Sequence, residues 1–467
     1  MEILDTLRQT LGAAQVLTGQ DTAKWSHDWT GKYTWTPLAV IRPASTEDVS
    51  SIAKACYASG TPMVPVGGNT GLTGATSADG AVMVSLERLN SIRKIKPEAR
   101  IAIVEAGVIL DQIHSAAADH DLTFPLTFGA RGSAMVGGFL ATNAGGSNVV
   151  RYGNTRELCL GLEVVLPDGR VMDLMSELRK DNTGYNLRNL FIGAEGTLGF
   201  ITAAVLKLFP KPRVQATAMV GLSTIDATLP LLNALQEATG GAVEAFEYMP
   251  RNYIERHVAK TGAREPFDAP HRVNILVEAA STRGDDAAPG PSGSARLVEL
   301  VQDILAQSME SGSIADAVVA QNEAQRAEMW ARREMAAELT FDGRAIVDTD
   351  IAVPLDAVPA FLAQINARVT KLDPGGEDFM VSHLGDGNVH YSVYPTRNDA
   401  ALMNEITEAI EDVTLSLGGS FSAEHGIGLS KLGSMARRKD ETALDVMGAL
   451  KTSLDPKGLM NPGKVLP

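Results

Sequence analysis

Two segments of this chain are so rich in glycine that they restrict how the strands around them can be connected. Residues 65–74 (PVGGNTGLTG) hold four glycines in ten positions, directly after an apolar run typical of a strand. Residues 129–153 hold seven in 25 positions, where 44 glycines in 467 residues predict about two. Loops without Cβ atoms let backbone N–H groups converge on an anion. Two such loops favour a dinucleotide pyrophosphate as the guest, whereas one alone would be typical of tight turns and bulges.

Neither loop matches the common nucleotide-binding motifs. The sequence contains no G-x-G-x-x-G in these loops and no G-x-x-x-x-G-K-[ST]. A Rossmann or P-loop nucleotide site is therefore disfavoured.

Hydrophobic patterning predicts an α+β chain with two lobes. Residues 37–66 are predicted to form strand, helix and strand, with Ser45 at the start of the helix and Gly60 at its end. From about residue 213, long strands alternate with Ala-rich helical segments, which indicates a second lobe. The expected domains are residues 1–212, residues 213–420, and a helical C-terminal segment, residues 421–467, that packs back on the first domain.

Composition excludes several classes of partner and compartment. The net charge of −15 and the pI near 5.1 argue against a nucleic-acid or anionic-membrane surface. Cys56 and Cys159 are far apart and form no C-x-x-C pair, which disfavours disulfides and fits a reducing compartment. No run of about 18 apolar residues occurs. We therefore expect a cytoplasmic protein, peripheral to the inner membrane at most.

A series of motifs resembles the flavoproteins of the vanillyl-alcohol oxidase / p-cresol methylhydroxylase (PCMH) superfamily. The motifs are PVGGNTGL from Pro65, GSAMVGG from Gly132, ATNAGG from Ala141, RYG from Arg151, GAEGTLG from Gly193 and NPGK from Asn461. The resemblance covers nearly the whole chain. It implies a two-subdomain PCMH-type FAD-binding domain over residues 1–212 and an α+β substrate and metal domain of the FAD-linked oxidase C-terminal type over residues 213–420.

The same resemblance assigns residues to the cofactor. The first loop would hold the FAD pyrophosphate through Gly67, Gly68, Asn69, Thr70 and Gly71. The cofactor's other side would be lined by Ser133, Gly137, Gly138, Asn143 and Gly146; Ile201 would contact the adenine half, and Asn461 of the last motif is a further candidate. Some members attach flavin covalently through His or Cys, and neither loop contains either residue, so we expect non-covalent FAD.

Three of the eight histidines lie in two glycine-flanked motifs. His383 and His390 flank the turn residues Asp386 and Gly387, and Glu424 precedes His425 in a distant segment. Two imidazoles and a carboxylate are the ligand set of a catalytic Zn²⁺ or a similar divalent ion. Two histidines at this spacing alone are more often ordinary polar loop residues.

These segments resemble the D-2-hydroxyglutarate and D-lactate dehydrogenase branch of the superfamily. That likeness implies that His383, His390 and Glu424 bind Zn²⁺ or Mn²⁺ and that His425 is the catalytic base. A divalent ion would acidify the substrate hydroxyl, an imidazole would take its proton, and flavin N5 would accept the hydride from Cα. Arg333, in a segment like the family's W-x-x-R, is the candidate for the substrate carboxylate, whereas Arg332 is expected on a solvated helix face.

Three positions depart from the D-2-hydroxyglutarate pattern. Ala337, Asp348 and Ser392 stand where that branch has Thr, Lys and Asn around the distal carboxylate. An Asp in place of a Lys would repel the second carboxylate of such a substrate. The sequence therefore favours a D-lactate-like monocarboxylate, with D-2-hydroxyglutarate as the alternative and a non-catalytic flavin- or metal-binding module as a third reading.

Such a dehydrogenase also needs an electron acceptor. An electron-transfer flavoprotein, a quinone and a cytochrome all remain open as partners, as does a homodimer.

Overall fold

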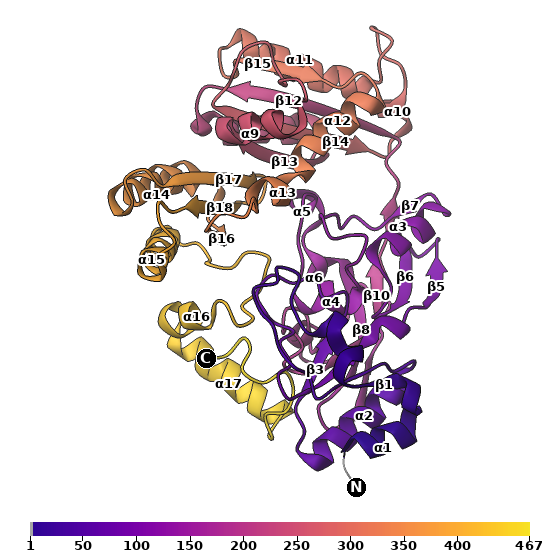
Figure 1. Ribbon diagram of the computed structural model, residues 1–467. Helices are drawn as coiled ribbons and strands as arrows, with labels where there is room; N and C mark the ends of the chain where they lie inside the picture. Colours follow the sequence, from indigo (N-terminus) through magenta and orange to yellow (C-terminus); the bar gives the residue numbers. More distant parts are fainter. Residues whose placement is uncertain (1–2) are drawn as a thin grey trace. The chain divides into compact units, whose positions relative to one another are not determined.

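The computed structural model describes residues 3–467 and divides the chain into two compact units (Figure 1). Of the described residues, the first unit contains 3–145, 153–210 and 424–467, and the second contains 146–152 and 211–423. Among the residues that the structure describes, no helix is long and apolar enough to cross a membrane.

The first sheet of the first unit contains the strand–helix–strand segment predicted for residues 37–66, which forms β2, α2 and β3. Its order is β1-β2-β4-β3, and both β2 and β3 run parallel to β4. Helix α2 (Thr46–Ser59) connects β2 to β3; Ser45 accepts a hydrogen bond from the Asp48 backbone at its start, and Gly60 closes it at φ 71°. The strands are β1 (Val16–Leu17), β2 (Ala39–Ile41), β3 (Met63–Val66) and β4 (Val82–Ser85), and α1 (Ile3–Leu11) packs on the same core.

The second sheet of the first unit is antiparallel, with the order β5-β6-β10-β8-β9. Its strands are β5 (Ile92–Lys96), β6 (Ile101–Glu105), β8 (Cys159–Val165), β9 (Val171–Leu174) and β10 (Phe200–Lys207). A small ribbon pairs β7 (Leu122–Thr123) with β11 (Phe209–Pro210). The helices around these strands are α3 (Leu110–Ala118), α4 (Val136–Ala141), α6 (Thr155–Leu158) and α7 (Arg188–Phe191). Two α+β subdomains thus carry the glycine loops, as the predicted fold class requires.

The second glycine-rich segment differs from its prediction in two respects. It is not wholly irregular, because it contains α4 and the short helix α5 (Val149–Tyr152). In addition, residues 146–152 belong to the second unit although the sequence assigned them to the first domain. The physical reason is a set of polar contacts: the Arg151 side chain donates to the carbonyls of Ala242 and Ala280, and pairs with Glu244 at 2.9 Å.

The second unit is built on one seven-stranded sheet with the order β15-β12-β14-β13-β17-β18-β16. The strands are β12 (Val214–Leu222), β13 (Val243–Pro250), β14 (Val273–Ser281), β15 (Asp316–Val319), β16 (Val347–Ala352), β17 (Glu377–His383) and β18 (Asn388–Tyr394). All neighbouring strands of this sheet pair in the antiparallel sense.

Helices cover both faces of this sheet (Figure 1). One face packs on α8 (Thr228–Thr239), α11 (Arg296–Glu310), α14 (Val358–Leu372) and α15 (Ala400–Ser416). The other face packs on α9 (Arg251–Thr261), α12 (Glu323–Glu334) and α13 (Ala336–Thr340), and α10 (Gly284–Ala287) lies in the loop after β14. Because side chains alternate along a strand, the face under α12 carries Glu247, Met249, Phe379 and Val381.

The end of the chain is helical, with α16 (Leu432–Arg438) and α17 (Glu441–Leu454). The buried Asp455 carboxylate follows α17 and accepts from the Leu459 and Met460 backbone. Lys451 donates to the same carboxylate at 2.6 Å and to the Thr197 carbonyl at 2.7 Å. These contacts attach the C-terminal tail to the GAEGTLG turn within the first unit.

Candidate active site

The first glycine loop leaves the end of β3 and presses against the second one. A Cβ at Gly68 would lie 2.1 Å from the Ser133 carbonyl oxygen, and a Cβ at Gly67 would lie 3.4 Å from Met135 Cβ. Asn69 adopts φ 54° and donates its side-chain amide to the His27 carbonyl. Only a residue without a side chain permits the approach at Gly68.

The same loop presents unused backbone donors. Across residues 3–467, the N–H groups of Asn69, Thr70 and Gly71 donate to no protein acceptor. Consecutive N–H groups of this kind form an anion-binding concavity. The loop therefore suits a phosphate group.

The other predicted cofactor residues fall into two kinds. Gly137 packs against Ala106, whereas Gly138 faces open space. Asn143, at φ 51°, uses Oδ1 to accept from the Arg156 backbone, so this part of its side chain is engaged at the start of α6. Ile201 is buried in β10, and Gly146 belongs to the second unit.

Asn461 is buried and connects the GAEGTLG motif to Ala75, the residue directly after the first glycine loop. Its amide nitrogen donates to the carbonyls of Ala75 and Glu195, at 3.0 and 2.7 Å. In the part of the chain that the structure describes, its Oδ1 is buried without a partner. An unsatisfied acceptor is costly unless a ligand supplies the donor. This oxygen and the loop donors fit a dinucleotide that offers both phosphates and N–H groups.

His383 and His390 lie on neighbouring strands, as the predicted turn requires. The hairpin pairs Val381 with His390 and His383 with Asn388, so both imidazoles project from the same face of the sheet. Their ring centroids are 5.4 Å apart, and ligand atoms of the two rings lie within 4.8 Å of one another. Such an arrangement can hold one metal ion between two rings.

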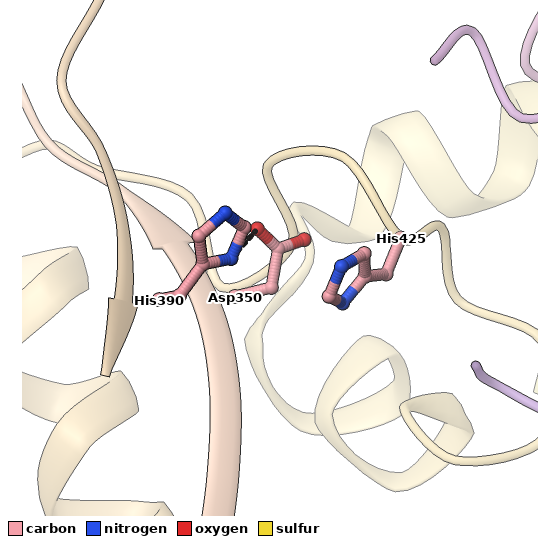
Figure 2. A group of neighbouring side chains, drawn as sticks. All are labelled: Asp350, His390 and His425. Carbon is pink, nitrogen blue, oxygen red and sulfur yellow. Dashed lines mark ion pairs between the residues drawn. The ribbon is translucent and has the colours of Figure 1, made fainter. Parts of the chain in front are cut away.

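Asp350 adds a carboxylate to this pair. It lies directly opposite His390 in the pairing of β16 with β18, with its Oδ1 3.6 Å from the His390 Nδ1 (Figure 2). Asn388 donates to the same Asp350 oxygen at 2.9 Å. The buried carboxylate can therefore orient the His390 ring.

Arg333 reaches the site from the end of α12. It is buried, and its Nε lies 2.7 Å from Glu247 Oε2, while His383 Nδ1 lies 2.9 Å from the same oxygen. Burial raises the pKa of Glu247, but the nearby His383 and Arg333 together lower it by more than burial raises it. The pKa of Glu247 therefore lies below its ordinary value. Glu247 is thus an ionised carboxylate at the centre of the cluster.

The prediction for Arg332 is wrong. This residue is as buried as its neighbour and donates to the Arg264 carbonyl at 3.1 Å. The reason is the packing of α12 on α9, where the Tyr253 hydroxyl donates to the Arg332 carbonyl.

The three departures from the D-2-hydroxyglutarate pattern also lie in the second unit. Asp348 and Ser392 are cross-strand partners, joined by a 2.7 Å hydrogen bond, one pleat repeat from Asp350 and His390. Ala337 is in α13. The carboxylate of Asp348 is therefore on the same face of the sheet as His390.

Glu424 and His425 begin the last segment of the first unit. The residue before them, Ala423, belongs to the second unit and donates its N–H to the Asp350 carbonyl. The other residue drawn in Figure 2, His425, is followed by a loop that Glu195 holds by accepting from the Ile427 and Gly428 backbone, at 2.7 and 2.8 Å. Backbone hydrogen bonds therefore hold the chain just before Glu424, at Ala423, and just after His425, at Ile427 and Gly428.

The first glycine loop with its anion-binding donors and a separate cluster of histidine, arginine and carboxylate side chains together fit a flavoprotein class of fold and site. Family models match both parts: an FAD binding domain over residues 37–175, and the C-terminal domain of FAD linked oxidases over residues 211–465. The chain belongs to the FAD linked oxidases.

Relatives match nearly the full length. A D-2-hydroxyglutarate dehydrogenase of Xanthomonas citri pv. viticola is 35% identical over 469 residues, which are 98% of this chain and 96% of that protein. One of Stutzerimonas stutzeri is 32% identical, with 99% and 98% covered. A structure of p-cresol methylhydroxylase with substrate bound matches at a TM-score of 0.74 and 15% identity, covering 99% of this chain and 96% of that one. The predicted superfamily and its oxidoreductase class are confirmed, and the structural match shows the fold.

Sequence reasoning missed Glu247 and Asp350 as parts of the site. Glu247 lies in β13, which also contains Glu244, so an acidic residue in this strand does not by itself single out Glu247. Asp350 stands in the D-I-A-V-P segment, but its position opposite His390 needs the strand register.

Proposed function

We propose that this protein is an FAD- and divalent-metal-dependent dehydrogenase that oxidises a D-2-hydroxy acid to the 2-oxo acid, with D-2-hydroxyglutarate as the leading substrate. The full-length similarity to proteins of that name supports the substrate. The observation that carries the chemistry is the buried group of Arg333, His383 and Glu247 beside His390.

The residues divide the work as follows. Arg333 pairs with the substrate carboxylate next to the reacting carbon, because its planar guanidinium matches two carboxylate oxygens. His425 takes the hydroxyl proton on an imidazole nitrogen. Bound FAD would supply the two-electron acceptor, and a divalent ion would supply Lewis acidity toward the hydroxyl.

The donor set fits Zn²⁺ or Mn²⁺. His383 and His390 offer imidazole nitrogens, and Glu424 is proposed as the carboxylate ligand. The loop of Gly67 to Gly71 and the Asn461 oxygen are proposed to hold FAD without a covalent bond, since neither glycine-rich segment contains His or Cys.

A second candidate is a D-lactate-like monocarboxylate. One observation favours it: Asp348 lies on the site face of β16, where a distal carboxylate would meet a like charge. The electron acceptor is proposed to be an electron-transfer flavoprotein, a quinone or a cytochrome.

Anaerobic bleaching of the flavin tests the proposal. Purified protein should be yellow, release FAD on denaturation, and lose flavin absorbance with D-2-hydroxyglutarate but not with its L-enantiomer. D-lactate and D-2-hydroxybutyrate complete the panel and separate the two candidates. A flavin that no hydroxy acid bleaches would contradict the enzymatic function and favour a binding module.

A further inference from the structure

We infer that Glu247 is a positioning residue that sets the tautomer of His383 and the orientation of Arg333 together. The inference deepens the proposed function and rests on it, because it assigns His383 to the metal and Arg333 to the substrate. One buried carboxylate would then control both the metal affinity and substrate binding.

The strand register places Glu247 at this junction. It pairs directly with His383 across β13 and β17, so both side chains leave the same face of the sheet. The Glu247 side chain is 1% exposed. An acidic group this deep in the protein is retained only when it is paired, and both of its partners are predicted site residues.

The distances specify the tautomer of the imidazole. His383 Nδ1 is 3.0 Å from Glu247 Oε1 and 2.9 Å from Oε2, so this nitrogen carries the proton and donates to the carboxylate. Nε2 is then the unprotonated nitrogen, which is the form in which an imidazole binds a metal ion. Carboxylate partners of this kind fix ring orientation at metal sites and raise the basicity of the ligand.

The same carboxylate holds Arg333 through Nε at 2.7 Å. Arg333 Nη2 also lies 3.4 Å from both ring nitrogens of His383, so the guanidinium packs against the imidazole. Because the contact with Glu247 uses Nε, the Nη groups can be presented to a second carboxylate, which we propose is that of the substrate.

The chain offers a matched control on the same helix and sheet. Glu278 on β14 is also buried and pairs with Arg326 of α12 at 2.7 Å. It accepts further hydrogen bonds from Thr217 and Trp330. Glu278→Gln therefore removes a similar buried charge from the same face without touching either histidine.

The experiment compares Glu247→Gln, Glu247→Asp and Glu278→Gln in the full-length protein. Zn²⁺ affinity is measured by competition with a fluorescent chelator, and KM is measured with D-2-hydroxyglutarate. Glu247→Gln should weaken Zn²⁺ binding by roughly 10- to 100-fold and raise KM by a similar factor, with flavin content unchanged. Glu247→Asp should do the same, because the shorter side chain cannot span both partners, and Glu278→Gln should leave both values within about twofold of wild type.

A measurement on wild type keeps the inference separate from the proposed function. The ring ¹⁵N shifts of neutral His383, assigned with His383→Asn, should show the proton on Nδ1. A proton on Nε2, or a folded Glu247→Gln protein with wild-type Zn²⁺ affinity and KM, would overturn the role of Glu247. If wild type binds no Zn²⁺ and oxidises no hydroxy acid, the proposed function fails, and the tautomer still decides the positioning role.

Discussion

At the scale of single residues, the approach of Gly68 to the Ser133 carbonyl is the most restrictive contact of the cofactor loops. Gly68→Ala would place a Cβ 2.1 Å from a backbone oxygen, so the two loops have to separate. We expect the variant to lose most of its FAD and to unfold at a lower temperature. Flavin content after gel filtration and a thermal melt are the measurements.

The control for this prediction is Gly448→Ala in α17, where an added Cβ meets nothing within 4 Å. Alanine favours a helix over glycine by about 0.5–1 kcal/mol. This variant should keep its FAD and be slightly more stable. Full flavin content in Gly68→Ala would contradict the packing described for the loops.

Glu195 gives a prediction about pH. Burial raises its pKa, although the Ile427 and Gly428 N–H groups counteract the shift. A raised pKa in the folded state means that the carboxyl contributes most stability below its unfolded pKa and loses it as pH rises through the folded value. Wild type should therefore lose stability relative to Glu195→Gln as the pH rises above about 4.5, the ordinary pKa of a glutamate. Urea unfolding of both proteins at several pH values checks this, and a relative gain with rising pH would contradict it.

The residues found by sequence and those missed differ in kind. Histidines, glycines and Arg333 stand out by type or motif, so their candidacy needed no coordinates. Glu247 becomes visible only through its pairing with His383, which joins strands 136 residues apart in the chain. Cross-strand register over such a distance is not encoded in any local pattern.

At the scale of elements, β16 presents Asp348 and Asp350 on one face beside β18. If D-2-hydroxyglutarate is the substrate, Asp348→Lys should raise kcat/KM for it relative to D-lactate by about tenfold, which corresponds to about 1.4 kcal/mol. Steady-state kinetics on both acids measure the ratio. Arg333→Ala should impair both acids alike, and an unchanged ratio in Asp348→Lys would mean that the distal group lies elsewhere.

Helix α17 depends on one ion pair at its end. Lys451→Met would leave the Asp455 carboxylate, which has no exposed surface, without its cation. Breaking such a buried pair typically costs about 3–5 kcal/mol. We expect a loss of that size in guanidinium unfolding, whereas Lys457→Met on the exposed side of the tail should change stability by less than about 0.5 kcal/mol. Equal effects of the two substitutions would contradict the structural role of Lys451.

Elements with clear signals were predicted well and short ones were not. The segment 37–66 follows its caps and apolar runs, and α2 begins and ends where Ser45 and Gly60 indicate. In the segment 129–153 the high glycine content predicts loops, so the sequence gives no sign of α4 and α5, which are only six and four residues long. Such short helices depend on packing rather than on propensity.

At the scale of the whole molecule, each unit has its own hydrophobic core. We expect two calorimetric transitions, of which added FAD raises the one that belongs to the first unit, since a ligand stabilises the part that binds it. Zn²⁺ should raise the other transition more, because two of its three proposed ligands, His383 and His390, belong to the second unit. A single transition that both ligands shift equally would contradict independent cores.

Because residues 146–152 belong to the second unit, they limit how this protein can be recombined with its relatives. The backbone passes between the units at four points, after residues 145, 152, 210 and 423. A chimera that exchanges residues 211–423 with those of a relative would keep Arg151 but replace Glu244 and the carbonyls of Ala242 and Ala280 to which Arg151 donates. The exchangeable module is therefore two pieces of sequence, and recombination that transplants the long piece without residues 146–152 should yield insoluble protein.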